Sequence, residues 1–222
     1  CAIPMIRGRF RSRKMEDIID EAKDLAARGV KELVVVAQDT TRYGEDLYEK
    51  QLLPKLLEEL CKIDGFVWIR TLYCYPERIT DELLDVIARE DKLAKYLDIP
   101  LQHCSKDVLK AMNRTGNRES LTALMQKIRQ RIPGITLRTT LIAGFPGETE
   151  ENFEELMEFV KEIRFERLGC FAYSAEEGTR AAAMKDQIPE EIKQQRADHI
   201  MEQQMFINEQ NNQAEIGKTK RA

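Results

Sequence analysis

Residues 136–149 read Thr-Leu-Arg-Thr-Thr-Leu-Ile-Ala-Gly-Phe-Pro-Gly-Glu-Thr, and the fold class can be inferred from them. Residues 136–143 are rich in apolar and β-branched residues and predict a strand. Two glycines and a proline then predict a tight turn. Thr149 is a suitable N-cap for a helix that we expect to end near Ile163. A strand that passes through a short turn into a helix is the repeating unit of α/β proteins.

The same alternation of strand and helix extends along the chain. Short connections between the elements imply right-handed crossovers and a parallel sheet. The first predicted strand is continuously apolar, which is typical of a strand covered on both faces. Five strands are too few for a closed eight-fold barrel, so we expect an open or incomplete sheet. The predicted strands are residues 32–37, 67–73, 96–101, 136–143 and 167–173, and the predicted helices are residues 14–28, 51–61, 80–89, 105–112, 119–131, 149–163 and a last one from after Pro189 to about Asn212.

The composition is that of one globular domain. The 222 residues are 42% hydrophobic and 33% charged, and a chain of this length can bury a large core. There is no run of about 18 apolar residues that would predict a transmembrane helix, and the arginine-rich start does not resemble a signal peptide. Five cysteines at irregular spacings indicate a reducing compartment and no disulfide framework. We therefore expect a cytoplasmic protein.

The charge is distributed unevenly. A formal net charge of −4 argues weakly against a domain that binds RNA by itself. Two interpretations of the basic start of the chain stay open: a solvated charged segment, or a segment that holds an anionic ligand. Residues 1–14 contain no acid and five basic residues, namely Arg7, Arg9, Arg11, Arg13 and Lys14.

Ligands of parallel α/β sheets bind at the carboxyl ends of the strands. Gly144 and Gly147 would allow a backbone to approach a ligand closely, although a plain turn that feeds a helix explains them as well. The segments that follow the predicted strands are polar or contain glycine, and they are residues 38–44, 74–78, 100–105, 144–149 and 171–174.

A hydrolase or isomerase is one interpretation of these strand ends. Asp39, Glu77 and Glu148 could supply paired carboxylates, and His103 could supply a base. The sequence contains no triad spacing, nucleophile elbow or phosphate-binding glycine loop. Such a function would therefore rest on the fold class alone.

Several segments together resemble the radical S-adenosylmethionine methylthiotransferases. The chain starts at a residue that resembles the third cysteine of that family's C-x-x-x-C-x-x-C motif. The segments occur in the family's order and cover essentially the whole chain. Residues 38–40, 102–103 and 171–179 look like the RimO family, which modifies a ribosomal protein, rather than the sister family that acts on transfer RNA. The matching segments are residues 1–13, 37–44, 98–103, 105, 108–114, 137–149 and 171–179.

The resemblance implies a [4Fe–4S] cluster on three cysteine thiolates, S-adenosylmethionine at the open iron, and a 5′-deoxyadenosyl radical. In the RimO family this radical removes hydrogen from the β-carbon of an aspartate in a small-subunit ribosomal protein. A second [4Fe–4S] cluster in an N-terminal domain and an electron donor such as flavodoxin or ferredoxin are also implied. The expected enzyme is monomeric and has no membrane partner. The implied fold is a partial (β/α)6 TIM-like barrel of the radical SAM type whose first strand is missing from this chain.

The same resemblance implies the domain boundaries. Residues 1–213 correspond to a radical SAM core domain that is truncated at its N-terminus, and residues 214–222 to the start of a C-terminal TRAM-like domain. Cys1 is the implied metal ligand, and the chain as written lacks the two cysteines that would complete the set. The other cysteines do not have the spacing to replace them. We expect Cys61 and Cys170 to be buried in ordinary packing, whereas Cys74 and Cys104 lie at strand ends and could reach a cavity.

The resemblance also implies residues that bind S-adenosylmethionine. Gln38 and Asp39 are expected near the methionine amino group. A bidentate contact with the methionine carboxylate suits an arginine. Residues 138, 140 and 142 share one face of their strand. For the aromatic candidates, ordinary core packing is the alternative to contact with adenine. The complete set of predicted cofactor-binding residues is Gln38, Asp39, Gln102, Ser105, Arg114, Arg138, Thr140, Ile142, Gly144, Phe171 and Tyr173.

No catalytic side chain can be assigned from the sequence. His103 is either a proton relay or a hydrogen-bonded structural histidine, and His199 is expected to be exposed. Two other functions stay open: a transfer-RNA methylthiotransferase, and a barrel that binds S-adenosylmethionine or a partner without redox chemistry. A C-x-x-x-C-x-x-C motif in the complete protein would argue against the last of these.

Overall fold

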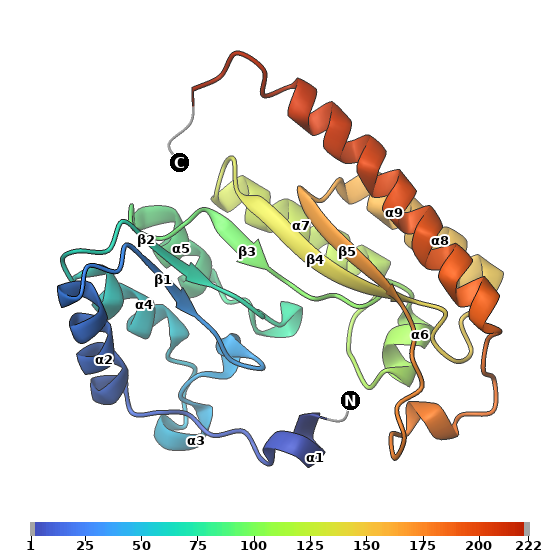
Figure 1. Cartoon of the computed structure of the whole chain (residues 1–222), viewed down its shortest axis with the longest axis horizontal. Coiled ribbons are helices and arrows are strands. Elements are labelled where there is room, and N and C mark those ends of the chain that lie inside the picture. The colour runs from blue at the N-terminus through green and yellow to red at the C-terminus, as the bar shows by residue number, and fades with distance from the viewer. Residues whose placement is uncertain (1–2, 220–222) are drawn as a thin grey trace. The chain divides into compact units, whose positions relative to one another are not determined.

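The computed structural model describes residues 3–219 (Figure 1). It divides into two compact units. Unit 1 comprises Cys1–Pro100 and Ala123–Thr136, and unit 2 comprises Leu101–Thr122 and Leu137–Ala222. Each unit is therefore built from two separate stretches of the chain.

Unit 1 contains parallel strands connected by helices. Leu33 of β1 lies opposite Ile69 of β2 in a parallel register. After β2, the amide of Cys74 donates a 2.8 Å hydrogen bond to the carbonyl of Asp98 in β3. The elements of unit 1 are α1 (Ile3–Arg7), α2 (Met15–Ala27), β1 (Glu32–Val35), η1 (Thr40–Arg42), α3 (Glu45–Tyr48), α4 (Leu53–Cys61), β2 (Trp68–Thr71), η2 (Pro76–Arg78), α5 (Asp81–Arg89), β3 (Tyr96–Asp98) and the later part of α7 (Arg118–Arg131).

The helices of unit 1 follow from their apolar spacing. α4 buries Leu53, Leu56, Leu57 and Leu60, which recur at the intervals that place side chains on one helix face. At the start of α5, the hydroxyl of Thr80 accepts a 3.2 Å hydrogen bond from the amide of Leu83. The predicted N-cap of this helix is confirmed.

Unit 2 contains the parallel pair β4 and β5, in which Thr140 lies opposite Gly169. Burial alternates along β4, as the sequence pattern predicts. Thr149 and Asn152 form a capping box at the start of α8. The long helix α9 packs against β5 and α8 (Figure 1). The elements of unit 2 are α6 (Lys106–Ala111), the first turn of α7, β4 (Thr136–Ala143), α8 (Glu150–Ile163), β5 (Arg167–Ala172), η3 (Ala181–Ala183) and α9 (Glu190–Gln213).

The expectation that the first strand is covered on both faces was wrong. Val34 in β1 is 44% exposed and Val36 just beyond it is 59% exposed. Within the described residues, β1 pairs with β2 alone, so its apolar run lies at a sheet edge. The predicted strand 67–73 also ends early, since Tyr73 adopts a φ of 59°, which leaves the extended region.

Candidate functional site

A buried cluster in unit 2 is centred on the carboxylate of Glu148, in the turn after β4. Both oxygens lie 3.0 Å from the amide nitrogen of Gly144. Oε1 also accepts a 2.8 Å hydrogen bond from Nη1 of Arg196 on α9, and Nε2 of His103 lies 3.3 Å from Oε2. A buried carboxylate is costly unless it is paired and hydrogen-bonded. The guanidinium of Arg196 and the Gly144 amide supply that compensation.

His103 has the environment of a structural histidine. Its side chain has no exposed surface, and its Nδ1 accepts a 2.9 Å hydrogen bond from the amide of Ser105. In the neutral ring the proton is then carried by Nε2, which faces Glu148. Among the described residues, Nε2 has no hydrogen-bond partner. The second histidine, His199, is exposed as predicted.

Gly144 is required at its position for two reasons. Its φ is +73°, and a Cβ would lie 2.4 Å from Cγ of Lys193 and 2.9 Å from the Lys193 Cα. The close approach of α9 and the left-handed backbone therefore both exclude a side chain. By contrast, a Cβ at Gly147 would meet no atom within 4 Å. The backbone of Gly144 is thus tightly positioned by its neighbours.

Gln102 carries backbone strain beside β4. Its amide donates to the carbonyl of Thr140 at 2.9 Å, and its carbonyl accepts from the amide of Ile142 at 2.8 Å. The φ of Gln102 is 70°, a conformation that costs a residue with a side chain about 1–3 kcal/mol and that clusters at ligand sites. Among the described residues, the buried Oε1 of Gln102 has no hydrogen-bond partner, and neither has the hydroxyl of Tyr173.

The structure brings some of the predicted ligand residues of unit 2 together. Arg138, Thr140 and Ile142 are half-buried on one face of β4, while their neighbours in the strand are buried. Phe171 lies opposite Ile142 in the parallel register, and its ring is 64% exposed.

The remaining predicted residues of unit 2 have different surroundings. Tyr173 is buried against Phe145, with ring centroids 5.2 Å apart. The hydroxyl of Ser105 accepts a 2.9 Å hydrogen bond from Asn152 at the start of α8. Arg114 is half-exposed in the loop after α6. Ser105 is therefore already engaged within the protein.

The two predicted ligand residues of unit 1 differ in environment. Gln38 is exposed. Asp39 is buried, and its Oδ1 accepts hydrogen bonds from the amide and hydroxyl of Thr41, while Nη1 of Arg78 lies 3.6 Å from Oδ2. Burial raises the pKa of Asp39, and the Thr41 hydrogen bonds and the Arg78 charge oppose that rise. An acid in such a position is a candidate functional group.

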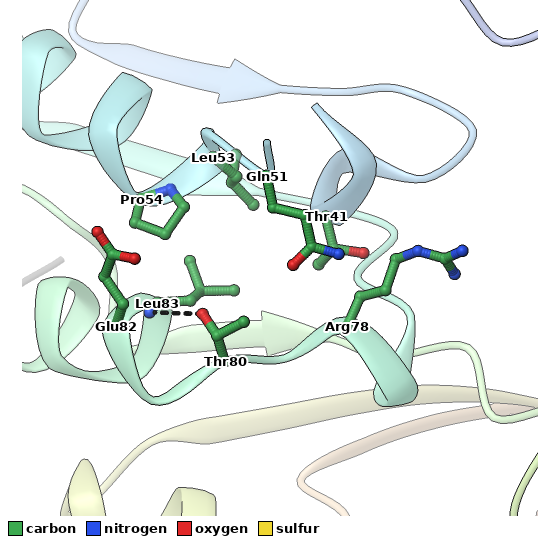
Figure 2. A pocket seen from close by; sticks show the side chains of 8 residues that line it. All are labelled: Thr41, Gln51, Leu53, Pro54, Arg78, Thr80, Glu82 and Leu83. Atoms are coloured by element: carbon green, nitrogen blue, oxygen red, sulfur yellow. Dashed lines mark hydrogen bonds between the residues drawn. The ribbon is translucent and has the colours of Figure 1, made fainter. Parts of the chain in front are cut away.

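Two hollows lie within unit 1. Figure 2 shows the smaller, of about 140 Å³, between α4, α5 and residues 41 and 78. The hydroxyl of Thr80 is engaged in capping α5 (Figure 2). Nε of Arg78 lies 3.4 Å from Oε1 of Glu45, a residue outside the hollow's lining. Ligand pockets usually measure about 300–1,000 Å³, so this hollow is too small for a nucleoside. The larger, of about 400 Å³, runs along β1 and α2 and is lined by residues that include Phe10, Val34, Val36 and Asp39.

The cysteines that the structure describes do not form a metal site. Burial raises the pKa of Cys61 to about 11, raises those of Cys74 and Cys170 to about 12, and raises that of Cys104 as well. Cys74 and Cys104 have no exposed surface, so neither reaches a cavity. Within residues 3–219, no three His, Cys, Asp or Glu side chains are grouped to hold a metal ion. Cys1, the predicted ligand, lies outside the described residues.

The chain matches the family model of the Radical SAM superfamily over residues 1–160, and it belongs to this superfamily. It is 54% identical over 218 residues to "Ribosomal protein uS12 methylthiotransferase RimO" of Clostridium tetani. The aligned region covers 98% of this chain and 49% of that relative. The protein of the same name from Clostridioides difficile is 56% identical over 219 residues, covering 99% of this chain and 49% of the relative. The chain thus spans about half the length of the curated relatives it matches.

A solved structure shows the same fold. Coproporphyrinogen III oxidase (HemN) from Escherichia coli, a radical SAM enzyme, matches with a TM-score of 0.64 at 21% identity, over 88% of this chain and 46% of that one. The predicted α/β class with parallel strands and the predicted resemblance are confirmed. None of the described helices is long and apolar enough to cross a membrane.

The buried cations of α9 were not predicted from the sequence. Lys193 and Arg196 are buried although their helix is mostly polar. A partial signal existed, because Lys193, Arg196, Ala197 and Ile200 recur at helical spacing on one face. The carboxylate that Arg196 contacts is 48 residues away in the sequence, so the pairing itself could not be read from local pattern.

Proposed function

We propose that this chain is the S-adenosylmethionine-binding core of a radical methylthiotransferase. Its substrate is the β-carbon of an aspartate in a ribosomal protein of the small subunit. Membership of the Radical SAM superfamily and relatives named as uS12 methylthiotransferases support the proposal. Because those relatives are about twice as long, the complete reaction uses parts of the protein beyond this chain.

The single observation that carries the proposal is the strained backbone of Gln102 together with its unpartnered side-chain oxygen. Its strained backbone is held by Thr140 and Ile142, and its Oε1 is buried without a partner among the described residues. An unsatisfied buried oxygen costs about 1–3 kcal/mol, and a ligand hydroxyl would relieve that cost. Gln102 therefore binds a ribose hydroxyl of S-adenosylmethionine in this proposal.

Other side chains complete the proposed binding site. Ile142 and the Gly144 backbone contact adenine, with Phe171 and Tyr173 as aromatic neighbours. Gln38 and Asp39 bind the amino group. The carboxylate and the remaining hydroxyl are bound by Ser105 at the N-cap of α6, by Arg114 in the loop after α6, and by Arg138 and Thr140 within β4.

The finer architecture belongs to the same proposal. The core spans residues 1–213 as a partial (β/α)6 barrel, and residues 214–222 begin a TRAM-like domain. Cys1 is one ligand of a [4Fe–4S] cluster, which when bound supplies the electron that cleaves S-adenosylmethionine. Within the part of the chain that the structure describes, no three His, Cys, Asp or Glu side chains form another ligand set. A second [4Fe–4S] cluster, a flavodoxin or ferredoxin donor, and a monomeric cytoplasmic enzyme complete the proposal.

Replacement of Gln102 by glycine in the full-length, reconstituted protein tests the proposal. Glycine adopts a φ of 70° without strain, so the Gln102→Gly variant should be at least as stable as the wild type. Loss of one ligand hydrogen bond should raise the KM for S-adenosylmethionine about tenfold in the formation of 5′-deoxyadenosine. Gln126→Gly, at an exposed position of α7, should lower stability and leave this KM unchanged. An unchanged KM in Gln102→Gly would contradict the proposed binding site. A wild-type protein that does not modify the isolated ribosomal protein would contradict the proposed function.

A further inference from the structure

The basic segment near the N-terminus has no role in the proposed S-adenosylmethionine site. Burial alternates along it, because Phe10 and Ser12 are partly buried whereas the residues between and beside them are exposed. The exposed cations beside Phe10 and Ser12 are therefore separated from one another by these partly buried residues. We call Arg9, Arg11 and Arg13 the arginine row.

The segment that carries the arginine row is anchored to unit 1 by hydrogen bonds. The amide of Ser12 donates a 2.8 Å hydrogen bond to Asp46, and the Ser12 hydroxyl accepts one of 3.0 Å from the amide of Gly44. The hydroxyl of Tyr43 donates to the carbonyl of Arg13 at 3.1 Å. These bonds hold the backbone, so the arginines project from a fixed support.

Two cations of the arginine row are uncompensated. Arg13 pairs with Glu21. Of the acids within residues 3–219, none forms an ion pair with Arg9 or Arg11, although the chain holds more acids than bases. Arg9 and Arg11 therefore present positive charge that no acid of residues 3–219 neutralises.

We infer that the arginine row binds the phosphate backbone of RNA. Guanidinium groups bind phosphates bidentately and stay charged at any physiological pH. A group of exposed cations suits the negative charge of a nucleic acid backbone, which is contacted without sequence readout. The partner that fits is the RNA around the substrate protein in the ribosomal particle, and this part of the inference rests on the proposed function.

Binding of a labelled single-stranded RNA by the full-length protein, followed by fluorescence anisotropy over a series of KCl concentrations, tests the inference. Arg9→Gln/Arg11→Gln should weaken binding about tenfold. Each lost phosphate contact lowers the salt-dependence slope by about 0.7, so the slope should fall by about 1.4. Arg28→Gln/Arg180→Gln removes the same charge from exposed positions elsewhere and should change affinity less than twofold.

Two results would overturn the inference. Equal losses in both double variants would show that only total charge matters. A poly-glutamate peptide and an unlabelled RNA of equal charge can each be tested as competitors. If the peptide competes as well as the RNA does, the partner of the arginine row is an acidic protein segment instead.

The failure of this inference can be distinguished from failure of the proposed function. Modification of the isolated ribosomal protein does not require RNA, so Arg9→Gln/Arg11→Gln should retain it and lose efficiency only on the RNA-containing particle. If the wild-type protein binds RNA through the arginine row but modifies no ribosomal protein, the proposed function is contradicted and the inference about RNA binding is not.

Discussion

Nε2 of His103 lies 3.3 Å from Oε2 of Glu148, and neither side chain is exposed to solvent. The same carboxylate contacts the Gly144 amide and the Arg196 guanidinium. Three separate segments of unit 2 therefore meet at one buried charge. Their relative positions depend on a carboxylate that the sequence alone suggested only as a possible hydrolase residue.

Removal of that carboxylate should destabilise the protein strongly. Glu148→Ala leaves the buried Arg196 without its main partner, and a broken buried pair typically costs about 3–5 kcal/mol. Glu148→Gln keeps an oxygen for Gly144 or Arg196 and should cost less. Urea unfolding followed by circular dichroism measures both. Glu154→Ala, at an exposed position of α8, should stay within about 0.5 kcal/mol of the wild type. A similar loss in all three variants would contradict the pairing.

Alanine at the two glycines after β4 should have unequal effects. Both glycines have a positive φ, so each substitution carries about 1–2 kcal/mol of backbone strain. Gly144→Ala adds the clash with Lys193, whereas Gly147→Ala meets open space. Thermal unfolding should therefore show the lower Tm for Gly144→Ala. Equal Tm values would mean that α9 does not hold its position against the Gly144 loop.

The pH dependence of stability should report the burial of Asp39. Burial raises its pKa in the folded protein above 3.8, so the folded state binds more protons than the unfolded state between these two values. The stabilising contribution is present below pH 3.8 and is lost as the pH rises through the folded pKa. Asp39→Asn has no such loss. Between pH 3.8 and the folded pKa of Asp39, the unfolding free energy of the wild type should fall relative to that of Asp39→Asn. At higher pH the two curves should run parallel. Parallel curves over the whole pH range would contradict the raised pKa of Asp39.

Thiol reactivity should follow burial. The pKa values of Cys61, Cys74, Cys104 and Cys170 are all raised, and the reactive species is the thiolate. At pH 8, alkylation of these four residues in the native protein should be at least tenfold slower than in urea, as measured by mass spectrometry of tryptic peptides. Rapid native labelling of Cys74 or Cys104 would show that a strand end opens to solvent.

Much of the fold could be predicted because its signals are local. β4 has its predicted bounds, and Thr80 and Thr149 cap their helices. The short helix α3 was not predicted, since four residues carry no recognisable period. The exposure of Val34 depends on which strands lie beside it, and an apolar run does not contain that information.

The candidate site was predictable only in part. The family resemblance implies that Gln102 and Thr140 belong to one ligand site, which stays a prediction. A backbone hydrogen bond joins the two residues. The left-handed φ of Gln102 and its unpartnered oxygen arise from tertiary structure. The burial of Arg196 likewise depends on a carboxylate distant in sequence, which no local pattern reveals.

The two-stretch composition of unit 1 has a consequence for synthesis. Arg131 pairs with Asp81 and Asp85 on α5, and Lys127 also pairs with Asp81, so part of unit 1 is translated after the chain has begun unit 2. A nascent chain that has emerged only to residue 100 cannot complete these pairs. Contacts between segments far apart in sequence slow folding. Unit 1 is therefore complete only after the ribosome has passed residues 101–122 and added residues 123–136.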